Sequence, residues 1–158
     1  MQGMEHRKND DPVNTAGGAA PSGTTHPLTA ILYRSDALTA EGSATDRQIL
    51  AEARRRNTAV NVTGFLHRES DVFYQWLEGP TAAVRVVFAS IANDPRHRNV
   101  EKLSEMTITE RNFRFWSMGS SETTAMSLFD WAAREGIALH TVRPEQILLF
   151  LLHCARRL

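Results

Sequence analysis

Residues 73–80 read FYQWLEGP, and this stretch decides how the rest of the chain is interpreted. Its alternation predicts a strand with the odd-numbered residues on one face and the even-numbered residues on the other. Both faces carry large apolar side chains, so we expect other elements to cover both. Gln75 is the polar member of the odd-numbered face, and a buried amide without partners costs about 1–3 kcal/mol. We therefore expect a hydrogen-bonding partner for Gln75 nearby in the fold.

Upstream of this stretch, the sequence predicts a strand followed by a helix. Residues 28–35 read LTAILYRS, whose alternation is typical of a strand, with Tyr33 among its apolar residues. Thr45 and Gln48 have the spacing of a capping box, and the apolar stripe behind them predicts a helix. The helix is expected to end near residues 54–57, which read RRRN, with Arg54 to Arg56 as a solvated helix end.

The complete order of elements indicates the fold class. After the first strand and helix, the patterns predict strand 60–67, turn 68–71, strand 72–77, a helix from 79–80 to 94–95, and strands 100–108 and 115–119. In the last of these strands, Trp116 and Met118 are expected to point the same way. This order predicts an α+β fold, a ferredoxin-like sandwich (βαββαββ) with two helices on one face of the sheet.

The C-terminal region predicts a cover for the other face of the sheet. Residues 123–136 and 144–158 are each typical of a helix with large apolar side chains. We expect these two additional helices to lie over Tyr74 and Trp76. Residues 148–152 are apolar almost all round, which leaves a contact between subunits as an alternative.

The composition indicates a chain that can bury a hydrophobic core and whose positive and negative charges balance. It has 158 residues, 42% of them hydrophobic, which predicts one domain. Lys plus Arg and Asp plus Glu are 18 each, which argues against direct nucleic-acid binding. No apolar run approaches a membrane span or a signal peptide, and the single cysteine, Cys154, excludes an internal disulfide. We therefore expect a cytoplasmic protein with no membrane contact.

The sequence contains no standard catalytic or metal-binding motif. It has no Gly-rich phosphate loop, no nucleophile elbow and no pair of histidines at metal-binding spacing. The histidines are scattered, and we expect surface or capping positions for His67, His97, His140 and His153. The chemistry instead gathers on polar groups set among apolar ones, namely Tyr33, Asn57 and Gln75.

Five segments recur here in the order of a known family. They are YRS at 33–35, RNTAVNVTGFL at 56–66, FYQWLEGP at 73–80, DPRHRNV at 94–100 and FRFWSMG at 113–119. Together they resemble the BLUF domains, which are blue-light sensors that use flavin adenine dinucleotide (FAD). The resemblance covers residues 28–119, and the fold of that family matches the predicted order of elements.

The resemblance implies a flavin site built from the two helices and the central strands. By matching motif, Tyr33 is the light-sensing tyrosine, Gln75 the switching glutamine and Asn57 the asparagine at the flavin edge. Ile49 and Ile91 would lie against the faces of the ring. The other positions implied in cofactor binding or in the response to light are Phe73, Arg96, His97, Trp116 and Met118.

The resemblance also implies light sensing without enzymatic catalysis and without a metal. Tyr33 would give an electron and a proton to the light-excited flavin, and Gln75, whose two amide ends differ, would then change its hydrogen-bonding state. The signal would leave through the last strand and the tail helices, toward an unidentified signalling protein or through a homo-oligomer. FMN stays an alternative to FAD.

The predicted organisation has three segments. These are a disordered N-terminal arm (1–27), a flavin-binding BLUF domain (28–119) and a C-terminal helical cap and output segment (120–158). The chain looks like the short, stand-alone type of the family.

Two other functions stay open at this point. A small ferredoxin-like hydrolase of the acyl-phosphate type would use Arg34 or Arg96 with Asn57 at an anion pocket, although the sequence has no Gly-rich anion nest. A protein-interaction module would keep the fold without a pigment. The colour of the purified protein distinguishes these functions.

Overall fold

The computed structural model describes residues 27–138 and 142–158. The predicted disordered arm, residues 1–27, lies outside the described residues except for Pro27. The Pro27 carbonyl accepts a hydrogen bond from the Thr81 backbone N–H at 3.3 Å. This bond connects the start of the first strand to the start of the second helix.

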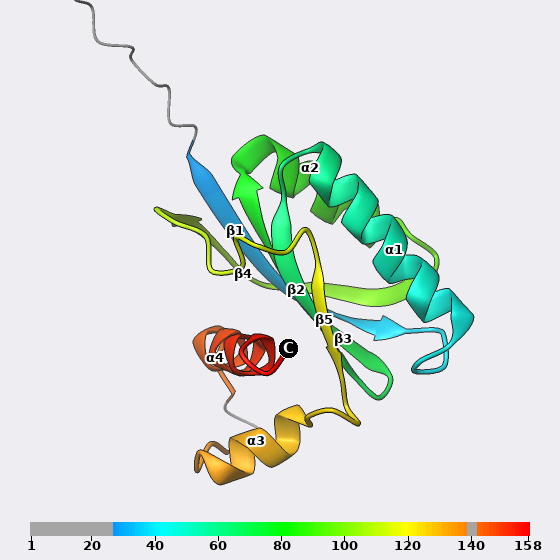
Figure 1. The fold of residues 1–158 in the computed structure, drawn as a ribbon, viewed down its shortest axis with the longest axis vertical. Coiled ribbons are helices and arrows are strands. Elements are labelled where there is room, and N and C mark those ends of the chain that lie inside the picture. The colour runs from blue at the N-terminus through cyan, green and yellow to red at the C-terminus, as the bar shows by residue number, and fades with distance from the viewer. Residues whose placement is uncertain (1–26, 139–141) are drawn as a thin grey trace, which may run out of the picture.

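The elements follow the predicted order along the chain (Figure 1). They are β1 (Leu28–Ala37), α1 (Ala44–Ala59), β2 (Thr63–Glu69), β3 (Val72–Pro80), α2 (Thr81–Ala92), β4 (His97–Ile108), β5 (Gly119–Glu122), α3 (Leu128–Arg134) and α4 (Pro144–Ala155). None of the described helices is both long and apolar enough to cross a membrane.

The five strands form one sheet in the order β4-β1-β3-β2-β5. The first four strands are antiparallel to their neighbours, and β5 adds parallel to β2. The predicted ferredoxin-like α+β sandwich is therefore confirmed. Strand β1 lies between β4 and β3, and its register places Tyr33 directly opposite Gln75.

The two faces of the sheet are covered by different helices (Figure 1). Helices α1 and α2 bury a core that includes Ile49, Val87 and Ile91 against Ile31 and Leu77. Because β3 alternates, its even-numbered side chains belong to the opposite core.

The C-terminal helices cover that opposite face, as the sequence predicted. Phe150 of α4 and Trp131 of α3 pack in one cluster with Trp76 and, at its border, Tyr74. Phe150 is fully buried, whereas Phe129, which the sequence placed on an apolar helix, is 49% exposed.

The last strand differs from its prediction. Residues 115–118 form a loop, and β5 begins only at Gly119. The Trp116 N–H bonds the Phe113 carbonyl at 3.1 Å, which closes a turn where an extended strand was expected. Trp116 and Met118 therefore do not point the same way, because Trp116 packs against Phe65 on one face and Met118 belongs to the core on the other.

The ends of the two long helices also differ slightly from the predicted ones. Ser43, not Thr45, caps α1, and its hydroxyl accepts from the Asp46 N–H at 3.1 Å. Pro80 is the N-cap of α2 and ends β3, so the helix begins one residue later, at Thr81. These shifts leave the buried stripes of both helices unchanged.

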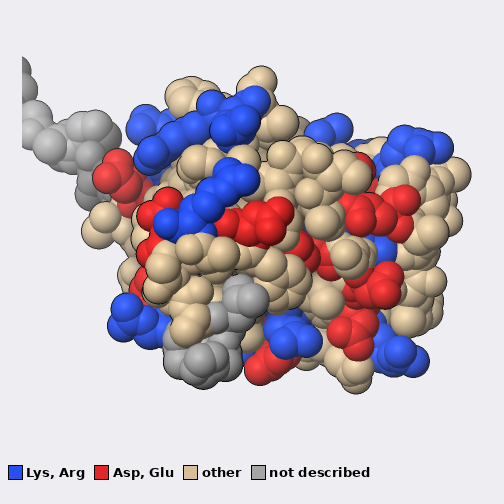
Figure 2. Space-filling view, turned by 90° about the horizontal axis from the view of Figure 1, so that it is seen from below, with Lys and Arg blue, Asp and Glu red and all other residues tan. Residues whose placement is uncertain are grey.

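The surface carries charges of both signs. Acidic and basic side chains are both present across the face shown in Figure 2, in keeping with the 18 cationic and 18 acidic residues of the chain.

Candidate functional site

A tyrosine and a glutamine meet in the core at the centre of the sheet. The Tyr33 hydroxyl donates a hydrogen bond to Gln75 Oε1, and the two side chains are 0% and 3% exposed. Burial raises the pKa of Tyr33 well above its usual range, while nearby Arg56 opposes this shift. The phenol is therefore held neutral, with its proton directed at the amide.

The other end of the Gln75 amide contacts the loop before β5. Gln75 Nε2 donates to the thioether sulfur of Met118 at 3.1 Å. Asn57 Nδ2 donates to the Ser117 carbonyl at 2.9 Å, and Arg54 Nε donates to the Met118 carbonyl at 2.9 Å. Residues 117–118 are thus held by side chains from both β3 and α1.

A narrow cleft of about 30 Å³ lies between α1 and α2, next to the tyrosine and glutamine. Six of the side chains predicted for the site line it: Tyr33, Ile49, Gln75, Ile91, Arg96 and His97. The two isoleucines come from different helices, so they supply apolar walls on opposite sides. The tertiary structure thus gathers these six residues at one cleft.

The other predicted site residues lie around the cleft without lining it. Phe73 is buried, with its ring centroid 5.0 Å from that of His97. Asn57 is 0% exposed, and its Oδ1 has no hydrogen-bond partner among the described residues. Trp116 lies farther away, beside Phe65 on the opposite face of the sheet. The structure therefore brings Met118, but not Trp116, to Gln75.

Helix α1 contributes cleft residues that the sequence interpretation missed. Glu52, Ala53 and Arg56 line the cleft beside Ile49, so the prediction of a solvated helix end is wrong at Arg56. Arg56 Nε is buried and has no partner in the part of the chain that is described. The spacing from Ile49 through Ala53 to Arg56 follows the period of a helix, and this signal could have identified the cleft-facing arginine.

An ion-pair cluster stands at the edge of the cleft. Arg96 bonds Asp94 and Glu52, with closest distances of 2.7 Å to each. Its hydrogen bond lowers the pKa of Asp94 to about 2. Next to this cluster, His97 Nδ1 bonds the Ser35 hydroxyl at 2.9 Å, and burial lowers the pKa of His97. His97 thus lines the cleft, where the family resemblance placed it, and does not have the surface position expected from the scattered histidines alone.

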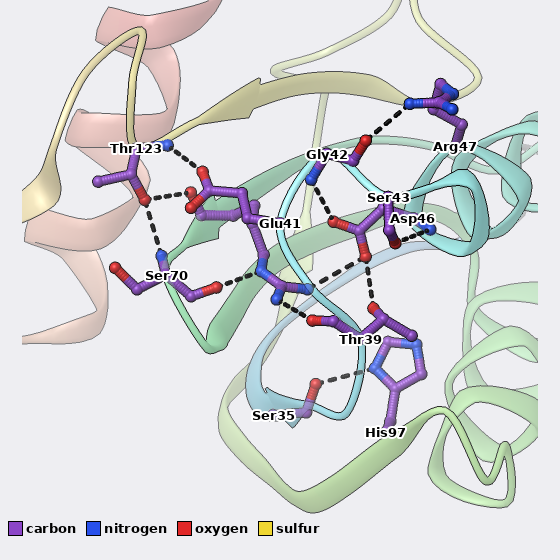
Figure 3. A network of polar contacts seen from close by, with 11 residues as sticks. Ser35, Thr39, Glu41, Gly42, Ser43, Asp46, Arg47, Ser70, His97 and Thr123 are labelled. Carbon is purple, nitrogen blue, oxygen red and sulfur yellow. Dashed lines mark hydrogen bonds and ion pairs between the residues drawn. The ribbon is translucent and has the colours of Figure 1, made fainter.

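A polar network fixes the loop that leads into α1 (Figure 3). Asp46 accepts from the Thr39 hydroxyl at 2.6 Å and from the Gly42 N–H at 3.1 Å. It also pairs with Arg68 at 3.2 Å, whose guanidinium lies 4.6 Å from the centre of the Phe73 ring. These contacts set where α1 begins, and hence where its cleft-facing residues lie.

A second buried polar cluster joins the sheet to the tail helices. His67 is 0% exposed, and it bonds Glu69 at 2.7 Å and the Ser121 hydroxyl at 2.9 Å. Glu69 accepts from the Ser127 hydroxyl and the Leu128 N–H, at the first turn of α3. Burial opposes ionisation of Glu69, but these hydrogen bonds outweigh it and lower its pKa. The expected surface position of His67 is therefore wrong; that of His140 falls outside the described residues.

This fold and site define an α+β sandwich domain in which a buried tyrosine and glutamine adjoin a cleft between two helices. A sequence model described as "BLUF: Sensors of blue-light using FAD" matches residues 28–119, more than half of the chain. The chain belongs to the BLUF family, a family of flavin-based blue-light sensors.

Related proteins place the same domain in different contexts. The blue light- and temperature-regulated antirepressor BluF of Escherichia coli is 37% identical over 76 residues, which are 48% of this chain and 19% of that protein. Photoactivated adenylate cyclase subunit beta of Euglena longa is 28% identical over 132 residues, 78% of this chain and 15% of that protein. The chain thus spans less than a fifth of the length of either relative.

A solved structure matches the fold over most of its length. The dark-state structure of the BLUF protein BlrB is 29% identical, with a TM-score of 0.69, and the match covers 83% of this chain and 98% of that one.

The geometry also weakens the hydrolase alternative. The side chain of Arg34 lies on the face of the sheet opposite to the cleft, where it lines a groove with Tyr74. Arg96 is bound by two carboxylates, and Asn57 does not line the cleft. Arg34 and Arg96 thus line different cavities, and Asn57, the partner that either arginine would need at an anion pocket, lines neither of them. Among the described residues, no group of His, Cys, Asp and Glu could hold a metal ion.

Proposed function

We propose that this protein is a blue-light photoreceptor that binds FAD in the cleft between α1 and α2. The hydrogen bond from Tyr33 to Gln75, buried beside that cleft in a BLUF domain, carries the proposal. The FAD of the family description supports this cofactor, and FMN is the alternative to test. The domain division predicted above, with residues 28–119 as the sensor, is part of the same proposal.

The residues around the cleft fit the chemistry of a flavin. Its ring needs apolar walls, which Ile49 and Ile91 offer, and partners for a hydrogen-bonding edge. Arg56 Nε, on a residue that lines the cleft, and Asn57 Oδ1, on one that does not, are buried polar atoms without a described partner, and we propose both as partners of such an edge. The cleft of about 30 Å³ is smaller than ligand pockets, which hold at least about 300 Å³. Binding therefore requires the side chains between α1 and α2 to move apart.

The bound flavin would supply light absorption and an acceptor for one electron. Tyr33 is the donor that we propose, because its hydroxyl already directs its proton at Gln75. Loss of an electron makes a phenol acidic, so the proton would move from the Tyr33 hydroxyl to Gln75 Oε1 as the electron leaves, and the electron and a proton would both return to Tyr33 afterwards. Gln75 would then exchange its donor and acceptor ends, which removes the Nε2 donor from Met118.

We propose that the signal leaves through β5. Met118 directly precedes β5, and Ser121 of β5 bonds His67. His67 bonds the carboxylate of Glu69, which in turn accepts from the Leu128 N–H at the start of α3. A changed contact at Met118 would move β5 and alter this chain of hydrogen bonds. The tail helices α3 and α4 would then change their packing on the sheet. This contiguous set of contacts is the physical support for the proposed output.

The receiver of the signal is proposed to be a separate protein or a second copy of this chain. The relatives that carry BLUF domains include photoactivated adenylate cyclases, so the domain can act on an effector. The tail is the surface that we propose for this contact, since Leu149 of α4 is 57% exposed. The cytoplasmic location also stays a prediction.

The test of the proposed function is the visible absorption spectrum of the purified protein. We expect a yellow protein whose flavin band shifts slightly to the red under blue light and returns in the dark. Release of the pigment by heat and its chromatography would distinguish FAD from FMN. A colourless protein that does not take up added FAD or FMN would refute the proposal.

The output route has its own test in the variant Glu69→Gln. We expect the reversible red shift to persist, because Glu69 lies away from the cleft, and the light-induced change in hydrogen exchange of α3 to disappear. Glu122→Gln, an exposed acidic residue in the same sheet, is the control. An unchanged light response of α3 in the Glu69 variant would contradict the route.

A further inference from the structure

A buried carboxylate three residues beyond Gln75 gathers hydrogen bonds from the β4–β5 loop, residues 109–118. Glu78 is 0% exposed. Its Oε2 accepts from Trp76 Nε1 at 2.8 Å and from the Asn112 N–H at 2.9 Å. Its Oε1 accepts from the Phe113 N–H at 2.5 Å and from the Thr63 hydroxyl at 3.2 Å. All four partners are donors, so both oxygens must accept, as those of a carboxylate do.

A cation lies next to this carboxylate without touching it directly. Arg111 Nη1 donates to the Thr63 hydroxyl at 2.9 Å and to the Glu78 carbonyl at 3.2 Å. Its Nη2 donates to the Asn61 carbonyl at 2.7 Å. The loop is thus fastened to β2 and β3 by a carboxylate and a guanidinium, joined through one hydroxyl.

The other end of the same loop reaches the proposed switch. The Trp116 carbonyl accepts from the Gly64 N–H at 3.1 Å, and Met118 Sδ accepts from Gln75 Nε2 at 3.1 Å. Between the two ends, Phe113 is buried and stacks on Phe65 at 5.5 Å. Strand β3 therefore holds the loop twice, at its start through Glu78 and at its end through Gln75.

We propose that Glu78 is a positioning residue of the light response, whose carboxylate fixes the start of the β4–β5 loop and so sets where Met118 meets the Gln75 amide. Glu78 and Gln75 hold the loop from one short strand. Only a few loop residues separate Asn112 and Phe113 from Met118, so a shift of the loop at its start is passed to Met118. The inference rests on the proposed function, because it concerns the same switch.

The variant Glu78→Gln separates this role from that of a general core residue. Glutamine keeps the shape but replaces one accepting oxygen with an NH2 group, which would face two donors. We expect a loosened loop and an easier return of Gln75 to its dark arrangement. The expected acceleration of dark recovery is about fivefold, which corresponds to about 1 kcal/mol of barrier.

The first measurement is the dark-recovery rate of the red-shifted band in a double-mutant cycle with Met118→Leu. If Glu78 acts through Met118, Glu78→Gln accelerates recovery in the native background and has little effect when Met118 is leucine. Equal acceleration in both backgrounds, or none in either, overturns the inference. Glu101→Gln is the control, since Glu101 is 63% exposed and its nearest cation, Arg34, is 3.9 Å away.

The second measurement needs no light. Hydrogen exchange at the Asn112 or the Phe113 amide should accelerate at least about tenfold in Glu78→Gln, because these N–H groups use different oxygens and the one that faces the new NH2 group loses its acceptor. Unchanged exchange overturns the inference even if the photoreceptor is active. If the native protein shows no red shift, the proposed function fails, while exchange still decides whether Glu78 holds the loop. Should Glu78→Gln not fold, Thr63→Val, which removes one of the four donors, must give a smaller change of the same sign.

Discussion

Replacing Tyr33 with phenylalanine tests the buried pair in both its structural and its functional role. The change removes one oxygen from a fully buried ring, and Gln75 Oε1 loses the donor that it has in the structure. An orphaned buried acceptor costs about 1–3 kcal/mol. Because removal of the hydroxyl also removes one buried polar group, we expect a loss near the lower end, about 1–2 kcal/mol.

Urea unfolding followed by tryptophan fluorescence measures this loss, and the visible spectrum measures the response to light. We expect Tyr33→Phe to bind flavin but to show no reversible red shift, because the electron and proton donor is gone. Tyr74→Phe is the matched control. Tyr74 is on the adjacent strand and half-buried on the opposite face, and its hydroxyl makes no hydrogen bond within the described part of the chain.

The control should keep its red shift and change the free energy of unfolding by less than about 0.5 kcal/mol. A Tyr33→Phe protein that retains the reversible shift would refute the proposed mechanism. A loss of stability no greater than that of Tyr74→Phe would show instead that the buried hydrogen bond is not formed as described.

Three further substitutions test other parts of the structure. Asp94→Asn should lower the free energy of unfolding at pH 7 by about 1 kcal/mol after solvent screening. Arg96 lowers the pKa of Asp94 from 3.8 to about 2, so the Asp94 carboxylate is lost as the pH falls through this range. The difference between the two proteins in urea titrations should therefore shrink from pH 4 toward pH 2. Phe150→Ala should lower the free energy of unfolding by about 3–5 kcal/mol in the same assay, since Phe150 is fully buried. The red shift should persist because Phe150 lies on the face of the sheet away from the cleft, and loss of the shift would contradict the separation of the two cores. Gly64→Ala should prevent folding, because a Cβ there would lie 2.0 Å from the Trp76 carbonyl oxygen, and a soluble variant with native circular dichroism would refute that packing.

The sequence predicted most of the fold because local periodicity reports local structure. The alternation around Gln75 identified both faces of β3, and the structure confirms that they belong to different cores. The period of the apolar residues likewise located both long helices. Where the prediction failed, a distant contact overrode the local pattern, as where the turn from Phe113 to Trp116 replaces the expected strand.

The candidate site was predictable to a similar extent. Matching motifs named Tyr33 and Gln75, and the strand register brings them together. Arg56 was missed because a run of three arginines is typical of a solvated helix end, and only the packing of α1 shows which of them faces inward. His67 was missed because its partners, Glu69 and Ser121, lie on two strands, and Ser121 is far along the chain.

The sequence by itself determined the family, the order of the elements and the identity of the tyrosine and glutamine, because motifs and periodicity are properties of neighbouring residues. Only the tertiary structure decided which end of the Gln75 amide meets Met118, which arginine enters the cleft, and how Glu78 holds the β4–β5 loop. Each of these depends on hydrogen bonds or packing between residues far apart in the chain. Such contacts form only when the sheet brings its strands together, so no local pattern records them.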